Sequence, residues 1–378
     1  MARTPRQLAA RRRGRRLRYV GMLLLVIAVI GGWSWFWFYA AGKAQVTVDA
    51  WRAREAKAGR VYACGTQTIG GYPFRIEVEC DKASAQFRSL QPPAELKTAH
   101  ILAAIQVYDP TLMISEFTGP LTVTTPGHGD LIANWKLLQS SVRGTPEAPQ
   151  RVSIVADHPR LDSTANGARQ NWLTARRVEL YGRIVEGSAA NRPVIETVLR
   201  LASASAPGFN PAAVQPVDAD ITAVLHGLKD FSPKPWAARF RQLQAAGGRI
   251  DIVRARVQQG QTIAVGGGTL ALNERGRLEG QLRVTVANIQ PFLNAIGAAR
   301  QVQNSQPVDK LAGALDRVAP GLGDVARAGA GANLSFGLDL LGEHTMLEGQ
   351  RALTLPLRLS DGTIFLGPIA IGTAPALF

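Results

Sequence analysis

The chain has 378 residues, of which 43 are Lys or Arg and 28 are Asp or Glu, giving a formal net charge of +15. A hydrophobic content of 46% excludes an intrinsically disordered chain, and the length predicts one large or two ordinary folded units. Charged residues, at 19%, fall below the globular average of about 25%, and the mean hydropathy is 0.00. Some of the apolar sequence therefore needs an environment other than an ordinary core.

Residues 1–18 form a basic tail with eight arginines and no acidic residue, and these arginines supply more than half of the net charge of +15. Six of them cluster beside the apolar segment that follows: Arg11, Arg12, Arg13, Arg15, Arg16 and Arg18. In the rest of the chain the basic residues are interspersed with acidic ones, and no basic patch alternates with aromatic residues. We therefore expect no nucleic-acid partner.

A transmembrane helix is predicted over residues 19–42, because these 24 residues carry no charge. As an α-helix they extend about 36 Å, more than the ~30 Å of a bilayer's hydrocarbon core. Trp33, Trp35 and Trp37 lie in the second half, where aromatic rings settle at the membrane interface. The alternatives are a core helix and a cleaved signal peptide. The length of the run and the aromatic residues at its end favour an uncleaved anchor.

The only two cysteines, Cys64 and Cys80, follow the apolar segment. They lie symmetrically about Gly70–Pro73, which is typical of a turn between two strands. An even pair in an exported domain predicts one disulfide, and two free thiols are the alternative.

Beyond the span, residues 43–59 predict a juxtamembrane helix that stops at Gly59. Short apolar runs broken by turn residues then predict a β-rich subdomain over 60–205, a Pro-rich linker over 206–217 and a second β-rich subdomain over 218–378. The clearest alternating strands are 278–287, 334–340 and 353–359, and helices are predicted at 193–204, 236–246, 291–299 and 309–326. The predicted fold is mainly β: an N-terminal transmembrane helix followed by curved antiparallel sheets with a few packing helices.

Motifs that carry chemistry are sparse. The five histidines show no metal-ligand spacing, and we expect neither a metal nor a cofactor nor catalytic residues. His128 and Asp130 are close enough in the sequence to suggest an acid/base pair, but the Pro and Gly residues beside them are explained by a turn. A hydrolase is therefore the weakest of the alternative functions. Glu77, Glu79 and Asp81 alternate as on a solvated strand face. Residues 266–268, three consecutive glycines, indicate a hairpin or bulge rather than a phosphate loop.

Gly71-Tyr72-Pro73-Phe74 resembles the GYPF motif of an uncharacterised family of bacterial inner-membrane-anchored proteins. Segments 236–288 and 355–369 are similar to the same family, and the resemblance spans residues 20–373. More distantly, the layout resembles AsmA-like envelope proteins, a resemblance that implies a role in envelope homeostasis and lipid movement along an apolar β-groove.

The basic tail and the resemblance together predict a single-pass protein of the bacterial inner membrane, with a cytoplasmic N-terminus and a periplasmic body. The expected function is non-enzymatic: envelope homeostasis or binding of an apolar, lipid ligand, with membrane lipid as a partner. The alternative is a structural scaffold that binds another envelope protein.

Overall fold

The computed structural model describes residues 5–90, 92–127, 129–145, 148–164, 167–208, 214–232, 234–288, 342–366 and 369–378. The chain divides into two compact units, Met1–Phe117 and Thr118–Phe378, called unit 1 and unit 2 below. The division falls within β5 (Asp109–Thr124). His128 and the segments predicted at 291–299, 309–326 and 334–340 lie outside the described residues.

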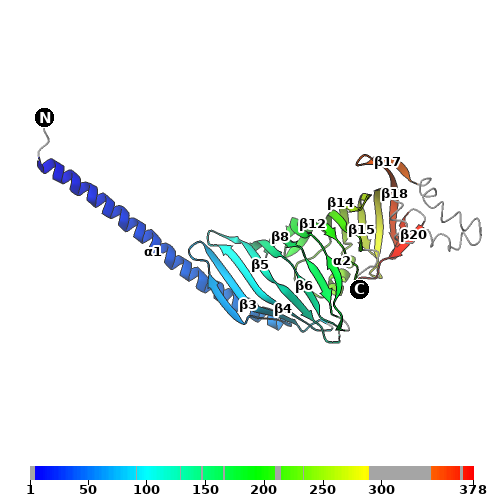
Figure 1. The fold of residues 1–378 in the computed structure, drawn as a ribbon, viewed down its shortest axis with the longest axis horizontal. Coiled ribbons are helices and arrows are strands. Elements are labelled where there is room, and N and C mark those ends of the chain that lie inside the picture. The colour runs from blue at the N-terminus through cyan, green and yellow to red at the C-terminus, as the bar shows by residue number, and fades with distance from the viewer. Residues whose placement is uncertain are drawn as a thin grey trace, which may run out of the picture. The chain divides into compact units, whose positions relative to one another are not determined.

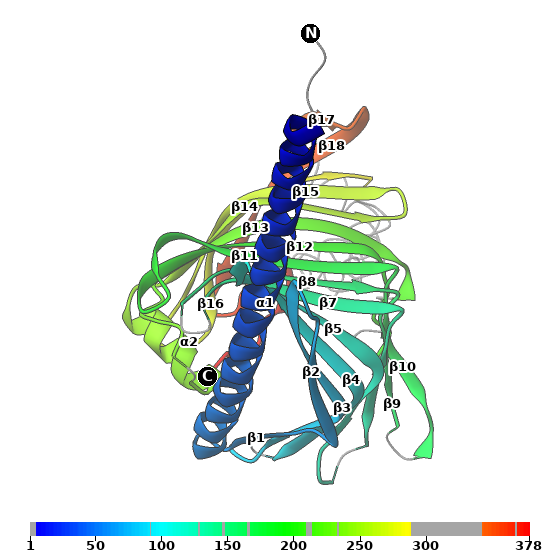
Figure 2. The same cartoon turned by 90° about the vertical axis from the view of Figure 1, so that its left-hand side faces the viewer.

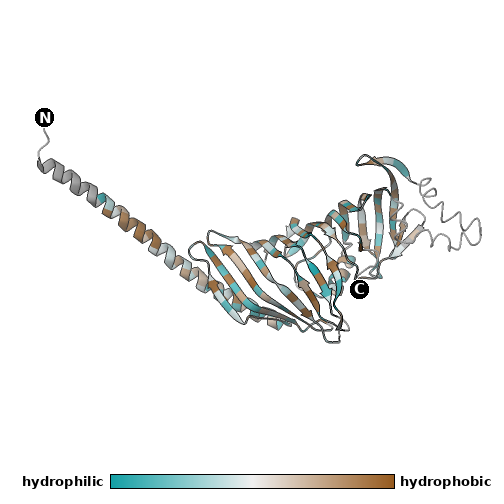
Figure 3. Ribbon diagram, in the orientation of Figure 1, coloured by the Kyte–Doolittle hydropathy of each residue, from teal (hydrophilic) through white to brown (hydrophobic). Residues whose placement is uncertain are grey.

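Unit 1 begins with α1 (Pro5–Lys57), a single helix of 53 residues. Between Arg18 and Lys57 it is long and apolar enough to cross a membrane, and only 6% of its most apolar window is buried. Figure 3 shows this apolar band along the helix. α1 continues without a break through the predicted juxtamembrane segment, and the chain turns at Gly59, where φ is 77°.

The strands of unit 1 pair antiparallel around one long central strand, β3 (Figure 1). β3 pairs along one edge with β2 and then β1, and along the other edge with β4. Besides the first part of β5, they are β1 (Arg60–Ala63), β2 (Thr66–Gly70), β3 (Arg75–Phe87) and β4 (Ala94–Gln106).

Unit 2 is built on one long antiparallel series of strands, β7-β8-β11-β12-β13-β14-β15-β16-β18-β19-β20, and Figure 2 shows that the longer ones bend along their length. The elements are β6 (Leu131–Asn134), β7 (Leu137–Thr145), β8 (Ala148–Asp157), β9 (Arg160–Ser163), β10 (Gln170–Thr174), β11 (Arg177–Ser188), β12 (Asn191–Ala204), β13 (Val217–His226), α2 (Trp236–Ala245), β14 (Arg249–Gln259), β15 (Thr262–Leu272), β16 (Leu278–Ala287), β17 (Glu343–Leu347), β18 (Gln350–Ser360), β19 (Thr363–Leu366) and β20 (Ile369–Thr373). The prediction of a mainly antiparallel β-protein behind an apolar helix is confirmed.

The helix predicted at 193–204 is wrong, because these residues form β12 between β11 and β13. Apolar residues point to both faces of this strand, which produced a helix-like spacing. The segment is rich in Val, Ile and Thr, whose branched side chains favour strands, and two neighbouring strands satisfy its backbone.

The helix predicted at 236–246 is confirmed as α2, together with its glycine stop. The Gly248 N–H donates to the Leu243 carbonyl at 2.7 Å, and Gly247 adopts a φ of 62°. This backbone arrangement ends helices because glycine reaches positive φ without a steric penalty.

The Pro-rich segment 206–217 joins β12 to β13, which are adjacent paired strands of unit 2.

The three glycines at 266–268 lie inside β15, opposite a register shift in β14 between Ile252 and Ala255. A Cβ at Gly268 would approach the Gln281 carbonyl oxygen to 2.3 Å, so glycine lets β15 and β16 pair closely here.

Candidate functional site: the anchor contact and an apolar sheet face

The turn between β2 and β3, residues 71–74, lies against α1 (Figure 1). The Trp33 indole N–H donates to the Pro73 carbonyl at 2.9 Å, and the Trp37 indole N–H donates to the Arg75 carbonyl at 2.7 Å. Ser34 Oγ donates to the Ile30 carbonyl, so the Tyr72 hydroxyl donates to Ser34 across 2.8 Å. Three polar groups of the turn region, the Tyr72 hydroxyl and the Pro73 and Arg75 carbonyls, are thus held by one face of the helix.

Aromatic contacts reinforce these hydrogen bonds. The Tyr72 ring meets the Trp37 ring edge-on at 5.5 Å and stacks on Phe38 at 6.1 Å, and Phe74 lies 6.2 Å from Trp33. Trp37 is 5% exposed, whereas Trp35 is 72% exposed and stacks on Tyr39. Two of the three predicted interface tryptophans therefore contact the body of the protein, and one points away from it.

Gly71 allows the turn to close. Its φ is 93°, and a Cβ there would lie 2.8 Å from the Arg75 carbonyl oxygen. The Arg75 N–H donates to the Gly71 carbonyl at 2.9 Å, which fixes the first residue of β3. A side chain at position 71 would be strained both by its backbone conformation and by this contact.

Sequence reasoning placed Trp33 and Trp37 at the membrane interface and did not predict that they bind the turn. Their i, i+4 spacing was the available signal, because residues four apart share one face of a helix. Arg18 is exposed at the start of the apolar segment, and the arginines at 11–13, 15 and 16 lie in α1.

The later part of α1 contacts the strands that surround the disulfide. Gln67 donates to Gln45 at 2.9 Å, and the Trp51 and Tyr62 rings are 4.7 Å apart. Cys64 and Cys80 are bonded, as predicted, with Cα atoms 5.4 Å apart, and the Arg52 guanidinium lies 3.0 Å from the Cys64 sulfur. The disulfide joins the β1–β2 connection to the middle of β3, so it fixes the strands on which the helix lies.

Replacing both cysteines with alanine should lower the free energy of unfolding of unit 1 by about 3 kcal/mol, because the 16-residue separation closes a loop of that entropic cost. Urea denaturation with and without a reductant measures the effect. Reduction should destabilise the natural protein by the same amount and leave the double variant unchanged. A reductant effect on the double variant would contradict this explanation.

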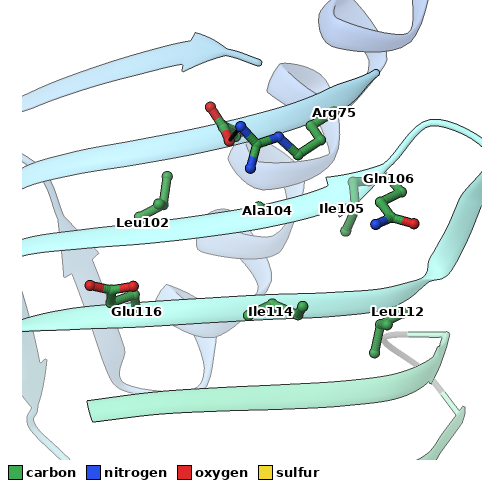
Figure 4. A pocket seen from close by; sticks show the side chains of 9 residues that line it. Arg75, Leu102, Ala104, Ile105, Gln106, Leu112, Ile114 and Glu116 are labelled. Carbon is green, nitrogen blue, oxygen red and sulfur yellow. Dashed lines mark ion pairs between the residues drawn. The ribbon is translucent and has the colours of Figure 1, made fainter. Parts of the chain in front are cut away.

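A shallow pocket of about 220 Å³ lies on β3, β4 and β5 in unit 1 (Figure 4). It is lined by Arg75, Glu77, Leu102, Ala104, Ile105, Gln106, Leu112, Ile114 and Glu116. Arg75 and Glu77 form an ion pair at 3.1 Å at its edge. The predicted solvated face of β3 continues with Glu79, which accepts a hydrogen bond from Thr68, and with Asp81, which is paired with His100 at 2.8 Å.

The second candidate site is one face of the sheet of unit 2, where strand register aligns apolar residues into four rows, called the apolar face below. The first row contains Ile154, Leu180, Leu199, Ile221, Ala255, Gly266, Val284 and Leu355. The second contains Ala156, Val178, Leu201, Ala219, Val257, Ala264, Val286 and Leu353. The third contains Val152, Gly182, Thr197, Ala223, Ile252, Gly268, Leu282 and Leu357. The fourth contains Ile184, Ile195, Leu225, Ile250, Leu270, Gly280 and Leu359. Thr197 is the one polar residue in these rows.

Burial changes along the apolar face. At the β18 end Leu355 is 0% exposed, and the Gly342 backbone lies against Leu353 and Leu355. At the other end Leu180 is 38% exposed and Ile154 is similarly open. The strands between them carry partly exposed apolar side chains. Among the described residues the first row is therefore closed at β18 and open at Ile154 and Leu180, whereas Ala156, in the second row of β8, is buried.

The opposite face of the same strands carries arginines and carboxylates that form ion pairs with one another. Arg177 pairs with Asp157 at 2.6 Å and with Glu179 at 2.5 Å, and Arg200 lies 3.6 Å from Glu179 and 3.5 Å from Asp220. The hydrogen bond from Arg177 is the main cause that lowers the pKa of Glu179 below its ordinary value. This face has the chemistry of a solvated surface.

Among the described residues, no group of three His, Cys, Asp or Glu side chains is arranged to hold a metal ion. His226 pairs with Asp251 at 3.0 Å on the charged face of the sheet. The Asp130 backbone carbonyl accepts a hydrogen bond from the Thr164 N–H at 2.9 Å.

No curated protein and no solved structure matches the chain. A family model described as "Uncharacterized protein conserved in bacteria (DUF2125)" matches residues 37–375. The matched range begins at Trp37 and includes the helix-docked turn, both cysteines and the whole sheet of unit 2. The resemblance to an uncharacterised bacterial family is confirmed. The chain therefore belongs to the bacterial family DUF2125.

Proposed function

We propose that this protein is a single-pass protein of the bacterial inner membrane whose periplasmic body binds an apolar, lipid ligand on the apolar face of unit 2, without catalysis. The observation that carries the proposal is the set of four apolar rows, which extend over seven or eight strands and whose first row is open at Ile154 and Leu180 among the described residues. Soluble proteins rarely leave an apolar surface of this extent open unless it has a binding function.

The contacts of α1 support a retained anchor rather than a cleaved signal peptide. Trp33, Ser34 and Trp37 bind the β2–β3 turn, and Trp37 is buried by it. Removal of the helix would leave the Pro73 and Arg75 carbonyls without these partners. A disulfide agrees with an oxidising compartment for the body, and the arginine tail agrees with a cytoplasmic N-terminus.

The test uses adjacent residues of β11 that point to opposite faces. With the photo-crosslinking residue p-benzoylphenylalanine at position 180, irradiation of intact cells should yield a lipid adduct on the purified full chain, detected by mass. The same residue at Tyr181, on the charged face, should yield none. Equal lipid labelling at both positions would contradict a specific apolar site. Adducts to another protein at position 180 would instead favour the scaffold function.

A further inference from the structure

Two neighbouring turns of unit 1 form an exposed aromatic end beside α1. The β2–β3 turn presents Tyr72 and Phe74, and the β4–β5 turn presents Tyr108. Phe74 is 60% and Tyr108 is 68% exposed. The Val107 N–H donates to the Phe74 carbonyl at 3.0 Å, so the two turns are held together. We call this surface the aromatic end.

The helix contacts set the depth of the aromatic end relative to the apolar span. Lys43 is the first charged residue after the uncharged segment 19–42. Trp37 and Trp33 precede it by about 9 and 15 Å along the helix, at roughly 1.5 Å per residue. The turn that both tryptophans bind lies at the same level. Since the headgroup layer is only about 5–8 Å thick on each side, this level reaches the edge of the hydrocarbon core.

The backbone of the β2–β3 turn suits an apolar environment. Three consecutive carbonyls accept hydrogen bonds: Pro73 from Trp33, Phe74 from Val107 and Arg75 from Trp37. Proline at position 73 also removes one N–H donor. Irregular backbone is tolerated at membrane depth only when its polar groups have internal partners. A turn in water has no such requirement.

The flanking charges agree with a position at the headgroup level. Arg75 follows the turn, and its exposed guanidinium uses one carboxylate, Glu77 at 3.1 Å, which leaves N–H donors for a phosphate oxygen. Asp109 follows Tyr108 and accepts a hydrogen bond from the Thr111 hydroxyl at 2.6 Å. These groups limit how deeply the aromatic end can enter. Tyrosine and tryptophan rings prefer this layer.

We propose that the aromatic end of unit 1 inserts into the bilayer interface on the side where α1 emerges, so that the body contacts the membrane directly and not only through its anchor. The partner is the interface of a phospholipid bilayer. The proposal rests on the membrane anchoring proposed above and is independent of ligand binding on the apolar face of unit 2.

The experiment places p-benzoylphenylalanine at single positions of the full chain in vesicles of phosphatidylethanolamine and phosphatidylglycerol. At Phe74 and at Tyr108, irradiation should increase the protein mass by one phospholipid. Leu90 is the matched control, because it is an exposed apolar residue in the turn at the opposite end of β3, and it should give no adduct. Leu24, inside the apolar segment 19–42, reports on the anchor itself.

Adducts at Leu24 without adducts at Phe74 and Tyr108 would overturn this proposal and leave the anchor intact. No adduct at Leu24 would overturn both the anchor and the contact. Equal labelling at Phe74 and Leu90, or cross-links from Phe74 to a second copy of the chain, would also overturn the proposed contact with the membrane interface.

Discussion

Replacing Leu355 with alanine should lower the free energy of unfolding of unit 2 by about 2–5 kcal/mol, the usual cost of a cavity in a closed core. Leu355 is 0% exposed, and the Gly342 backbone contacts its side chain. Replacing Leu180, in the same row, should cost about 1 kcal/mol or less, because its side chain is 38% exposed before the change.

Urea denaturation of the full chain in detergent, followed by circular dichroism, measures both variants. The two residues have the same chemistry and belong to one register row, so the difference between them reports on coverage alone. Equal costs at the two positions would mean that Leu180 is also closely packed. The accessible apolar face, and with it the main support for lipid binding, would then be wrong.

Local features of this fold could be predicted from the sequence because their signals are local. The uncharged segment 19–42 predicted the apolar part of α1, and alternation over 278–287 predicted β16 with the bounds that the structure has. Cys64 and Cys80 flanked a turn sequence and are bonded. In each case the determining residues are close together in the chain.

The wrong prediction at β12 and the correct one at β16 both depended on how the apolar residues of each strand are divided between its two faces. In β16 apolar and polar residues alternate, so the period of two is visible. β12 carries Val194 and Val198 on one face and Ile195, Leu199 and Leu201 on the other, which obscures the alternation. Its assignment depends on β11 and β13, and those pairings are not local.

Both candidate sites depend on long-range register, which sequence patterns do not give. The apolar face forms only when seven or eight strands align without a one-residue slip, since a slip would move every side chain to the other face. The turn at 71–74 meets helix residues about 40 positions earlier. Each partner was visible in the sequence, but their contact was not.

A loss of stability as large as that of the Leu355 variant is expected when the contact between α1 and the β2–β3 turn is removed. Replacing Trp37 with alanine should release the β2–β3 turn, because the change removes a side chain that is 5% exposed, its 2.7 Å hydrogen bond to Arg75 and its edge contact with Tyr72. Truncation of a buried tryptophan costs about 3–5 kcal/mol. Amide hydrogen exchange of residues 71–78 in the full chain, reconstituted in lipid, should therefore become faster.

Two matched variants separate the causes. Replacing Trp35 with alanine removes an equally large ring that is 72% exposed and has no contact with the turn among the interactions of the described residues, so exchange at 71–78 should not change. Replacing Trp37 with phenylalanine keeps an aromatic ring and removes the indole N–H, which should cost about 1 kcal/mol, the net contribution of one hydrogen bond. If the Trp35 and Trp37 alanine variants loosened the turn equally, the effect would come from the membrane position of the helix and not from the contact. The order Trp37→Ala, then Trp37→Phe, then Trp35→Ala would instead show that the Trp37 side chain, through both its ring and its indole N–H, helps to hold the first long strand of the body against the anchor.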